Sequence, residues 1–332
     1  MKPNAHASHS MLGLVTLCTA ALYAGGAFAQ GADAYPSRPV TIIVPLSPGA
    51  AVDIETRLYA QKMSESMGKP FLVDYKPGAG TTIGGAFVSR AAPDGYTLLS
   101  LTPSLTIATM AYPKLSFDPL KDLTLISLMS KRPSLFIVPN NVPAKNMQEF
   151  MAYAKANPNK VNLGTSGAGG IGELALSWLQ LMAGSKAQLV HYKGGAPSYK
   201  AVMAGEVQAV LGSLAAMGAN IRAGKARAIA VTTAERTSVL PDLPTIAEQG
   251  FPGFEYAQWI GVAGPAGLPA ALTNRLSTEF AKAAKAPDVG AKLDDDGTLI
   301  VGSTPEQFRK HFLAEAARWR KVAQDTGVKL AQ

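Results

Sequence analysis

The sequence predicts an α/β protein of two lobes, each built on a mostly parallel sheet flanked by helices and joined to the other by crossing strands. Short apolar runs rich in β-branched residues alternate with helical patterns, which is typical of layered α/β folds. This series begins twice, at residues 40–44 and again at residues 134–138. After one more apolar strand at residues 259–263, the last part of the chain is helical.

The first series opens with a continuous apolar strand at residues 40–44, as expected for a strand covered on both faces. A helix follows from Asp53, because apolar residues then recur at helical spacing. Further strands are predicted at residues 71–73 and 96–101, with a helix from about Thr82 between them.

The second series has strands at residues 161–164, 188–192, 208–211 and 228–231, separated by helices. Asn146 with Glu149 resembles a capping box, and Pro269 and Pro305 suit the first turns of two closing helices. The crossings are expected near residues 131–137 and 255–263. One lobe would then combine residues 30–133 with 256–332, and the other would span residues 134–255.

The first 29 residues are typical of a secretory signal peptide. Lys2 precedes an apolar run at residues 11–24, which is shorter than the roughly 20 residues of a membrane-spanning helix. Ala27 and Ala29 predict cleavage near Ala29 and therefore export to the periplasm. Since Cys18 is the only cysteine, the mature chain would have none.

The net charge of +8 favours attraction of anions. The basic residues are scattered, however, and the densest group, Arg318, Arg320 and Lys321, has Glu315 and Asp325 close by in the sequence. This pattern is typical of a solvated helix face. We expect no nucleic-acid partner.

Four loops share one design, in which a strand end is followed by small residues and a helix start. They cover residues 47–53, 78–84, 165–172 and 193–196. In parallel α/β sheets, ligands bind outside the carboxyl ends of the strands. The first amides of a helix lack intrahelical partners and carry the positive end of its dipole. Two such loops from different lobes predict a clamp for a carboxylate.

Two other kinds of chemistry have weaker support. Residues 167–172 match GxGxxG, but no Asp or Glu occurs between Leu174 and Gly205 to bind a ribose. Residues 164–168 approach a GxSxG nucleophile elbow, with Ala168 in place of the last glycine. A secreted serine hydrolase stays open as an alternative and would need His191 or His311 as its base.

Metal binding and cofactors are not expected. Two separated histidines and no cysteine give no zinc cluster in the mature chain. The acidic run at residues 294–296, followed by Gly297, lacks EF-hand spacing and suits a solvated turn.

The chain resembles the substrate-binding proteins of tripartite tricarboxylate transporters, the Bug-type periplasmic receptors. The segments that carry this resemblance are residues 35–39, 48–53, 76–80, 92–96, 165–167, 192–194, 240–245 and 259–261. The resemblance implies a type II-like periplasmic binding fold that closes around a small carboxylate and delivers it to membrane permease subunits. It also implies that the loops at residues 49–53 and 165–169 hold the carboxylate.

The residues expected to contact the ligand come from both lobes. They are Ser47, Gly49, Ala50, Ala51, Val52, Asp53, Thr102 and Ser104 in the first lobe, and Thr165, Ser166, Gly167, Ala168, Gly169, Gly194, Gly195 and Ser213 in the second. We expect a monomer without catalytic activity. A receptor that presents its ligand to a signalling protein, instead of a permease, is the other alternative.

Several of these loop positions depart from the family pattern. Ala50 stands where a second glycine is usual, and Val52 where Ser or Thr is usual. Ala168, Gly170 and Ile171 replace common polar residues, the segment 212–214 lacks the common acidic-Asn pair, and the loop at residues 102–105 is rather apolar. Fewer hydroxyls and amides predict an aromatic or otherwise apolar carboxylate rather than citrate or an acidic amino acid.

Overall fold

The computed structural model describes residues 35–112, 114–294 and 296–330. The chain divides into two units, Met1–Ser37 and Arg38–Gln332, and the helices and strands described below all belong to the second unit. The expected signal peptide at residues 1–29, with Cys18, lies outside the described residues, and so does Asp295 of the acidic run.

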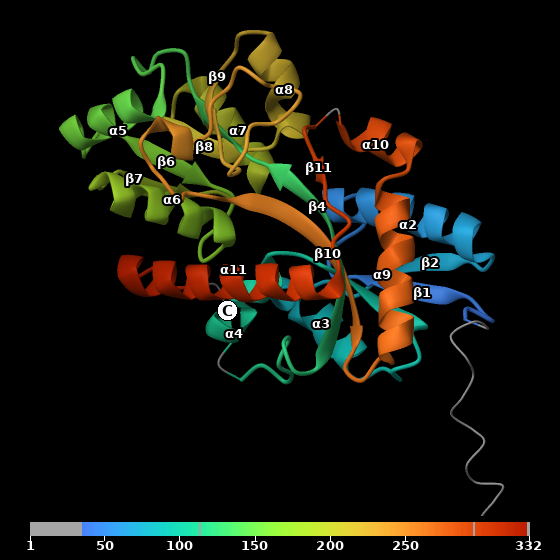
Figure 1. Ribbon diagram of the computed structural model, residues 1–332. Coiled ribbons are helices and arrows are strands. Elements are labelled where there is room, and N and C mark those ends of the chain that lie inside the picture. Colours follow the sequence, from blue (N-terminus) through green and yellow to red (C-terminus); the bar gives the residue numbers. More distant parts are fainter. Residues whose placement is uncertain (1–34, 113, 295, 331–332) are drawn as a thin grey trace, which may run out of the picture. The chain divides into compact units, whose positions relative to one another are not determined.

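The first lobe is built on a six-stranded sheet in the order β11-β4-β10-β3-β1-β2 (Figure 1). Its strands are β1 (Val40–Val44), β2 (Phe71–Tyr75), β3 (Thr97–Leu101), β4 (Leu123–Pro133), β10 (Ala257–Pro265) and β11 (Leu299–Ile300). Its helices are α2 (Ala51–Met67), α3 (Thr82–Ser89), α4 (Ser104–Ala111), α9 (Ala270–Ala284), α10 (Pro287–Asp294) and α11 (Pro305–Thr326), with a short 3₁₀ turn, η2 (Ala79–Thr81), before α3.

The second lobe is built on a five-stranded sheet in the order β7-β6-β8-β5-β9. Its strands are β5 (Leu135–Val138), β6 (Asn162–Thr165), β7 (Gln188–His191), β8 (Ala209–Gly212) and β9 (Arg227–Val231). Its helices are α5 (Met147–Ala156), α6 (Ile171–Ala183), α7 (Gly195–Ala204) and α8 (Leu214–Arg222), with a 3₁₀ turn, η3 (Ala247–Gln249), after β9.

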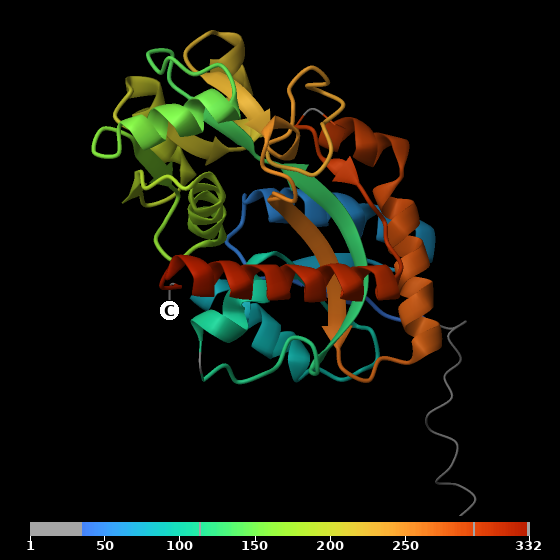
Figure 2. The same ribbon diagram turned by 60° about the vertical axis from the view of Figure 1, so that its left-hand side comes forward.

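Both sheets are mixed, with antiparallel strands beside a majority that run in one direction. In the first, β1 is parallel to β2 and β3, whereas β10 is antiparallel to both β3 and β4. In the second, β6 is parallel to β7 and β8, whereas β5 is antiparallel to β8 and β9. In the first sheet, β4 carries the chain away and β10 brings it back alongside in the opposite direction (Figure 2). The two-lobed α/β class itself is confirmed.

The second sheet is covered on both faces. Phe136 and Val138 of β5 belong to a core shared with α5 and α6, whereas Leu135 and Ile137 belong to a core shared with α7 and α8. This alternation follows from the two-residue period of a strand. Because neither face meets water, the strand is apolar at all four positions.

Helix α11 connects the cores of the two lobes. Thr304 and Gln307 form a capping box that fixes its start. Near that start, Phe308 meets Trp259 of β10 edge to face, at 5.6 Å between ring centroids. Farther along, Trp319 lies in the core of the second lobe, 6.0 Å from Trp178 of α6. The helix therefore links the lobes a third time, in addition to the two crossing strands.

Some elements differ from the sequence-based expectation. Helix α2 begins at Ala51, two residues before the expected start. Helix α4 begins at Ser104, where a loop was expected. Asn146 caps α5, but the Glu149 carboxylate accepts the Lys145 amide, so only half of the expected capping box is present.

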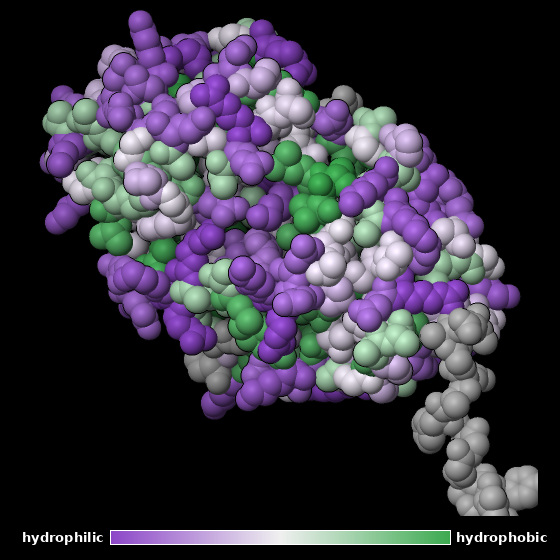
Figure 3. Space-filling view, in the orientation of Figure 1, coloured by the Kyte–Doolittle hydropathy of each residue, from purple (hydrophilic) through white to green (hydrophobic). Residues whose placement is uncertain are grey.

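The face seen in Figure 1 is mostly hydrophilic, with apolar atoms gathered near its middle (Figure 3). In the described part of the chain, no helix has the length and apolarity needed to cross a membrane.

Candidate functional site

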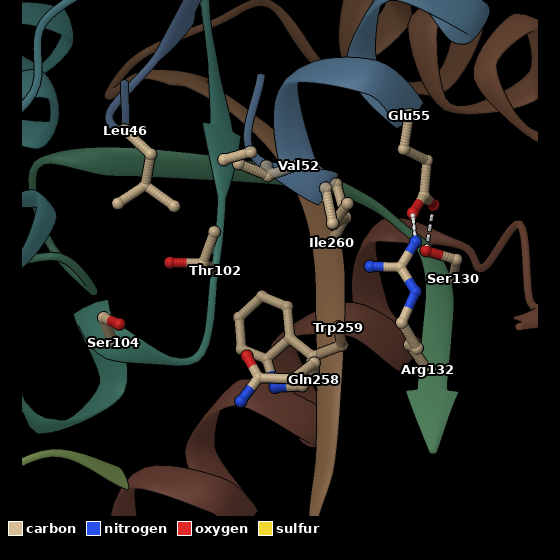
Figure 4. A pocket seen from close by; sticks show the side chains of 12 residues that line it. Leu46, Val52, Glu55, Thr102, Ser104, Ser130, Arg132, Gln258, Trp259 and Ile260 are labelled. Carbon is tan, nitrogen blue, oxygen red and sulfur yellow. Dashed lines mark hydrogen bonds and ion pairs between the residues drawn. The ribbon is translucent and has the colours of Figure 1, made fainter. Parts of the chain in front are cut away.

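A cavity of about 170 Å³ lies in the first lobe, beside the start of α2 (Figure 4). Its walls come from the β1–α2 loop, the β3–α4 junction and the crossing strands β4 and β10. The lining residues are Leu46, Ala50, Ala51, Val52, Glu55, Thr102, Ser104, Ser130, Arg132, Gln258, Trp259 and Ile260. Five of the residues expected to contact a ligand, Ala50, Ala51, Val52, Thr102 and Ser104, are thus brought together here.

Two residues at the start of α2, Ala51 and Val52, line this cavity. The first intrahelical hydrogen bonds are donated by Asp53 and Ile54, both to the Ala50 carbonyl. The amides of Ala51 and Val52 therefore precede the bonded part of the helix, where amides have no intrahelical acceptor. These donors and the helix dipole favour a negative group at this position.

Asp53 shapes the loop and does not face the cavity. Its Oδ2 accepts the Gly49 amide at 2.8 Å, which holds Gly49 in a left-handed conformation with φ of 83°. Its Oδ1 accepts hydrogen bonds from the Tyr75 hydroxyl at 2.7 Å and from Arg57 Nε at 2.9 Å. Burial acts to raise the pKa of Asp53, but the Gly49 amide, Tyr75 and Arg57 together hold this pKa below its usual value. An ionised Asp53 is thus already neutralised by its neighbours.

One end of the cavity contains a buried ion-pair network. Arg132 Nη2 donates to Glu55 Oε2 at 3.0 Å, and its Nε donates to Asp296 Oδ2 at 2.6 Å. Ser130 and Tyr59 also donate to Glu55 Oε1. Burial raises the pKa of Glu55, and the charge of Arg132 opposes that rise. Since Arg132 lies between two acidic groups, it is poorly placed to hold a ligand carboxylate as well.

The Thr102 hydroxyl is buried, and Oγ1 has no hydrogen-bond partner within the described structure. The residue is 7% exposed, and it faces the cavity between Leu46 and Ser104 in Figure 4. An unpaired buried hydroxyl costs about 1–3 kcal/mol. A ligand oxygen in the cavity would supply the missing partner.

Strand β10 forms an apolar wall with one polar group. Trp259 and Ile260 are buried, and Ile260 packs against Val52. Gln258 Nε2 donates to the Tyr256 hydroxyl at 2.5 Å. The residues expected from the sequence to contact a ligand do not include Gln258, Trp259, Ile260, Ser130 or Arg132, which line this cavity.

The loop between β6 and α6 forms a second, separate cluster in the second lobe. Thr165 Oγ1 and His191 Nδ1 are 2.9 Å apart, and the Gly194 amide donates to the Ser166 carbonyl at 3.0 Å. The Gly169 amide donates to Glu173 Oε2 at 2.6 Å. These contacts tie the expected residues 165–169 to the strand end at residues 191–194.

The remaining expected residues lie at neighbouring helix starts. Gly194 is the N-cap of α7 and Gly195 its first residue. Ser213 is the N-cap of α8, and its hydroxyl accepts the Ala216 amide at 3.3 Å. Ser47 and Gly49 lie in the β1–α2 loop and Asp53 in the first turn of α2, all outside the lining of the described cavity.

A short chain of contacts leads from the α6 start to the cavity. A Cβ placed on Gly172 would lie 3.9 Å from the Tyr256 hydroxyl. That hydroxyl accepts the hydrogen bond from Gln258, which lines the cavity. The first turn of α6 therefore lies near Tyr256, whose hydroxyl is bonded to a residue of the cavity lining.

The arrangement does not match a serine nucleophile. His191 Nδ1 is bonded to Thr165 rather than to Ser166, and the Thr165 side chain is buried. His311 lies on α11 against Trp259, at 5.5 Å between ring centroids. Among the described residues, no three His, Cys, Asp or Glu side chains are grouped so as to hold a metal ion.

Two mixed α/β lobes, joined by crossing strands and carrying helix starts beside a cavity, define the class of two-lobed solute-binding proteins. Comparison with known proteins identifies the family. Residues 56–328 match the family described as "Tripartite tricarboxylate transporter family receptor". The chain belongs to this family and is a solute-binding receptor of the TctC and Bug type.

Relatives match along most of the chain. A Pseudomonas sp. (strain P51) protein from the tcbD-tcbE intergenic region is 36% identical over 89% of this chain and 88% of its own. Protein BugT of Bordetella pertussis is 31% identical over 92% of this chain and 95% of its own. The solved structure of R. palustris Rpa4515 with adipate has a TM-score of 0.75 and 33% identity, covering 89% of this chain and 99% of that one.

Proposed function

We propose that this protein captures a small organic carboxylate between its two lobes and delivers it to the membrane subunits of a tripartite tricarboxylate transporter. The observation that carries the proposal is that Ala51 and Val52, which precede the first hydrogen-bonded amides of α2, line a largely apolar cavity. A hydrogen bond to a charged group contributes about 1.5–3 kcal/mol. Two amides and the Thr102 hydroxyl would thus supply a large part of the roughly 8 kcal/mol of micromolar binding.

The body of the ligand is proposed to be aromatic or otherwise apolar. Leu46, Val52, Trp259 and Ile260 line the cavity, whereas its arginine is already paired. A ligand with several charged groups would find few free partners there. The adipate bound by R. palustris Rpa4515 has an unbranched hydrocarbon centre, which agrees with this class of ligand.

Closure of the lobes is proposed to complete the site. The moving parts would be residues 30–133 with 256–332, and residues 134–255, as the sequence predicts. Ser47, Gly49 and Asp53 would shape the first-lobe loop, and Thr165, Ser166, Gly167, Ala168, Gly169, Gly194, Gly195 and Ser213 would approach the ligand from the other lobe. Binding then favours the closed form, because only there do both lobes contact the ligand.

The remaining features of the proposal follow from the family and the sequence. We infer cleavage of residues 1–29, a periplasmic location, a monomer, and binding without catalysis or a cofactor. The contact of His191 Nδ1 with Thr165, rather than with Ser166, supports the absence of hydrolysis.

The direct test uses a panel of organic acids in calorimetry and thermal shift. We expect aromatic and medium-chain aliphatic carboxylates to bind, and citrate and acidic amino acids to bind weakly or not at all. Tight binding of citrate or an amino acid, with none to apolar acids, would reject the ligand class.

The amide clamp is tested by Ala51→Pro. Proline is tolerated at the first position of a helix, and Ala50 already has the extended conformation that precedes proline (φ −67°, ψ 156°). The variant removes one amide, so binding of the tightest acid should weaken tenfold or more, about 1.4 kcal/mol. Ala270→Pro makes the same change at the first position of α9 and should leave binding unaltered. Equal affinities of the two variants would show that the amide does not hold the ligand.

A further inference from the structure

The wall of the cavity contains one hydrogen-bond acceptor without a partner, on Gln258. This side chain lines the same cavity as Ala51 and Thr102. Its Nε2 donates to the Tyr256 hydroxyl at 2.5 Å, and among the described residues none donates to its Oε1. In Figure 4 the oxygen is on the side of the carboxamide nearer to Thr102, and the nitrogen is on the other side. A ligand in the cavity would therefore meet a carbonyl oxygen at Gln258.

The other end of this hydrogen bond is fixed in the second lobe. Tyr256 is 4% exposed, and its ring meets Trp319 edge to face at 6.2 Å between centroids. Burial raises the pKa of Tyr256 to about 12, and the hydrogen bond from Gln258 opposes that rise. The hydroxyl is therefore neutral in the pH range of a binding experiment. Because Tyr256 is packed into a core, the amide bonded to it is also held in place.

The other polar groups of the cavity do not have this character. Ser130 and Arg132 both donate to Glu55, so all three side chains are already paired. The hydroxyls of Thr102 and Ser104 can donate to a ligand carboxylate as well as accept. An amide oxygen can only accept a hydrogen bond. Gln258 Oε1 is thus suited to a part of the ligand that donates.

The positions of the lining residues separate this part of the ligand from its carboxylate. In Figure 4 the Trp259 ring lies between Val52, at the start of α2, and Gln258. An apolar ligand body beside this ring would therefore have its carboxylate toward α2 and a donor toward Gln258. A second carboxylate or an apolar group next to Oε1 would lose its water contacts or leave the oxygen unpaired.

Building on the proposed function, we propose that Gln258 determines ligand specificity by accepting a hydrogen bond from a neutral donor on the ligand. The ligand class is then an apolar carboxylate that carries one hydroxyl or amide N–H group away from its carboxylate. A hydrogen bond between neutral groups changes affinity by about threefold to tenfold.

A purely structural role for Gln258 makes a different prediction. If its amide served only to join β10 to Tyr256, its substitution would lower stability or weaken all carboxylates by the same factor. The ratio of affinities for two ligands that differ only in a donor separates the two roles. Gln180 of α6 provides a matched control, because its Oε1 also lacks a partner within the described structure and it does not line the cavity.

Calorimetry measures this ratio for the wild type, Gln258→Met and Gln180→Met. The probes are three pairs, 4-hydroxybenzoate with 4-fluorobenzoate, 3-hydroxybenzoate with 3-fluorobenzoate, and 6-hydroxyhexanoate with 6-fluorohexanoate. In each pair a fluorine, which cannot donate a hydrogen bond, replaces a hydroxyl of similar size. Methionine has a length similar to that of glutamine and only a weakly accepting sulfur. Thermal unfolding of each variant confirms that it is folded.

We expect the wild type and Gln180→Met to bind the hydroxy acid of at least one pair about threefold to tenfold more tightly than the fluoro acid. In Gln258→Met the two members of that pair should bind with about equal affinity. A wild type that binds the fluoro acid at least as tightly in every pair overturns the inference, as does a preference that Gln258→Met retains. Binding of other organic acids, with none of these six probes bound, also overturns it. These outcomes leave the proposed function intact, whereas a wild type that binds no carboxylate of the wider panel would overturn the function and the inference together.

Discussion

The indole Nε1 of Trp259 donates a hydrogen bond of 2.6 Å to Glu315 Oε2 in the interior of the first lobe. Trp259 is 1% exposed and its ring forms part of the cavity wall, while Glu315 comes from α11. Burial raises the pKa of Glu315, and the hydrogen bond from Trp259 opposes that rise. A helix that enters the cores of both lobes therefore also holds a wall of the candidate site.

Glu315→Ala should reduce the free energy of unfolding by about 1–3 kcal/mol, because it leaves the buried indole N–H unpaired. Glu315→Gln retains an oxygen that can accept this hydrogen bond, so its free energy of unfolding should fall by less. Urea unfolding followed by tryptophan fluorescence measures both variants. If the two are equally stable, the hydrogen bond does not contribute as described.

His311 should make stability depend on pH. Burial lowers its pKa to about 4, with further lowering by Lys131 and Arg318, while Glu255 acts in the opposite direction. The unfolded chain, with a histidine pKa near 6.5, binds the proton first as pH falls. The free energy of unfolding should therefore be highest above about pH 6.5. It should fall by up to about 3 kcal/mol between about pH 6.5 and about pH 4.

The comparison variant for this prediction is His311→Phe, which has a similar shape and no titrating group. Glu55 and Glu315 have pKa values raised by burial, so they favour the folded state as pH falls and oppose the effect of His311. Only the difference between wild type and His311→Phe, measured by urea unfolding from pH 7 to pH 4.5, isolates the histidine. A difference that stays constant across this range contradicts the prediction.

Local sequence patterns predicted the fold well because they determine local structure. The apolar run of β1 and the proline at the start of α11 each predict the structure of the segment in which they lie. The antiparallel pairing of β4 with β10 was not predicted, because it joins positions more than 120 residues apart, such as Leu123 and Pro265. No periodic pattern in either strand specifies that partner.

Local sequence patterns also predicted only part of the candidate site. Ala51 and Thr102 were identified because small residues and hydroxyls at strand ends are local signals. Arg132 and Glu55 were not, since their pairing joins positions 77 apart in the sequence. The cavity side of Trp259 was also not foreseen, and the two-residue period of a strand would not have revealed it, because the consecutive residues Gln258, Trp259 and Ile260 all line the cavity.

Gly261 of β10 should not tolerate a side chain. A Cβ at this position would lie 2.2 Å from Cζ of Phe308 on α11. Gly261→Ala should therefore destabilise the protein by about 1–3 kcal/mol or more. Gly290→Ala in α10, where nothing lies within 4 Å of the added Cβ, should stabilise it by about 0.4–1 kcal/mol. Thermal unfolding that shows the two substitutions to be equivalent would mean that the contact between β10 and α11 is not close.

Thr102→Val tests whether the unpaired hydroxyl serves the ligand. The substitution keeps the shape of the side chain and removes a buried oxygen that lacks a partner. The ligand-free protein should therefore become more stable, by about 1 kcal/mol, while affinity for the tightest carboxylate falls about fivefold or more. Thr273→Val is the matched control, because Thr273 in α9 also has a buried, unpaired hydroxyl and does not line the cavity.

The Thr273→Val variant should gain the same free energy of unfolding as Thr102→Val and should keep the full affinity for the carboxylate. A substitution that raises the free energy of unfolding but lowers the affinity indicates a polar group that serves the ligand. A buried, unpaired hydroxyl without that role would only destabilise the protein. Calorimetry that finds equal affinities for Thr102→Val and Thr273→Val would place the ligand out of reach of Thr102.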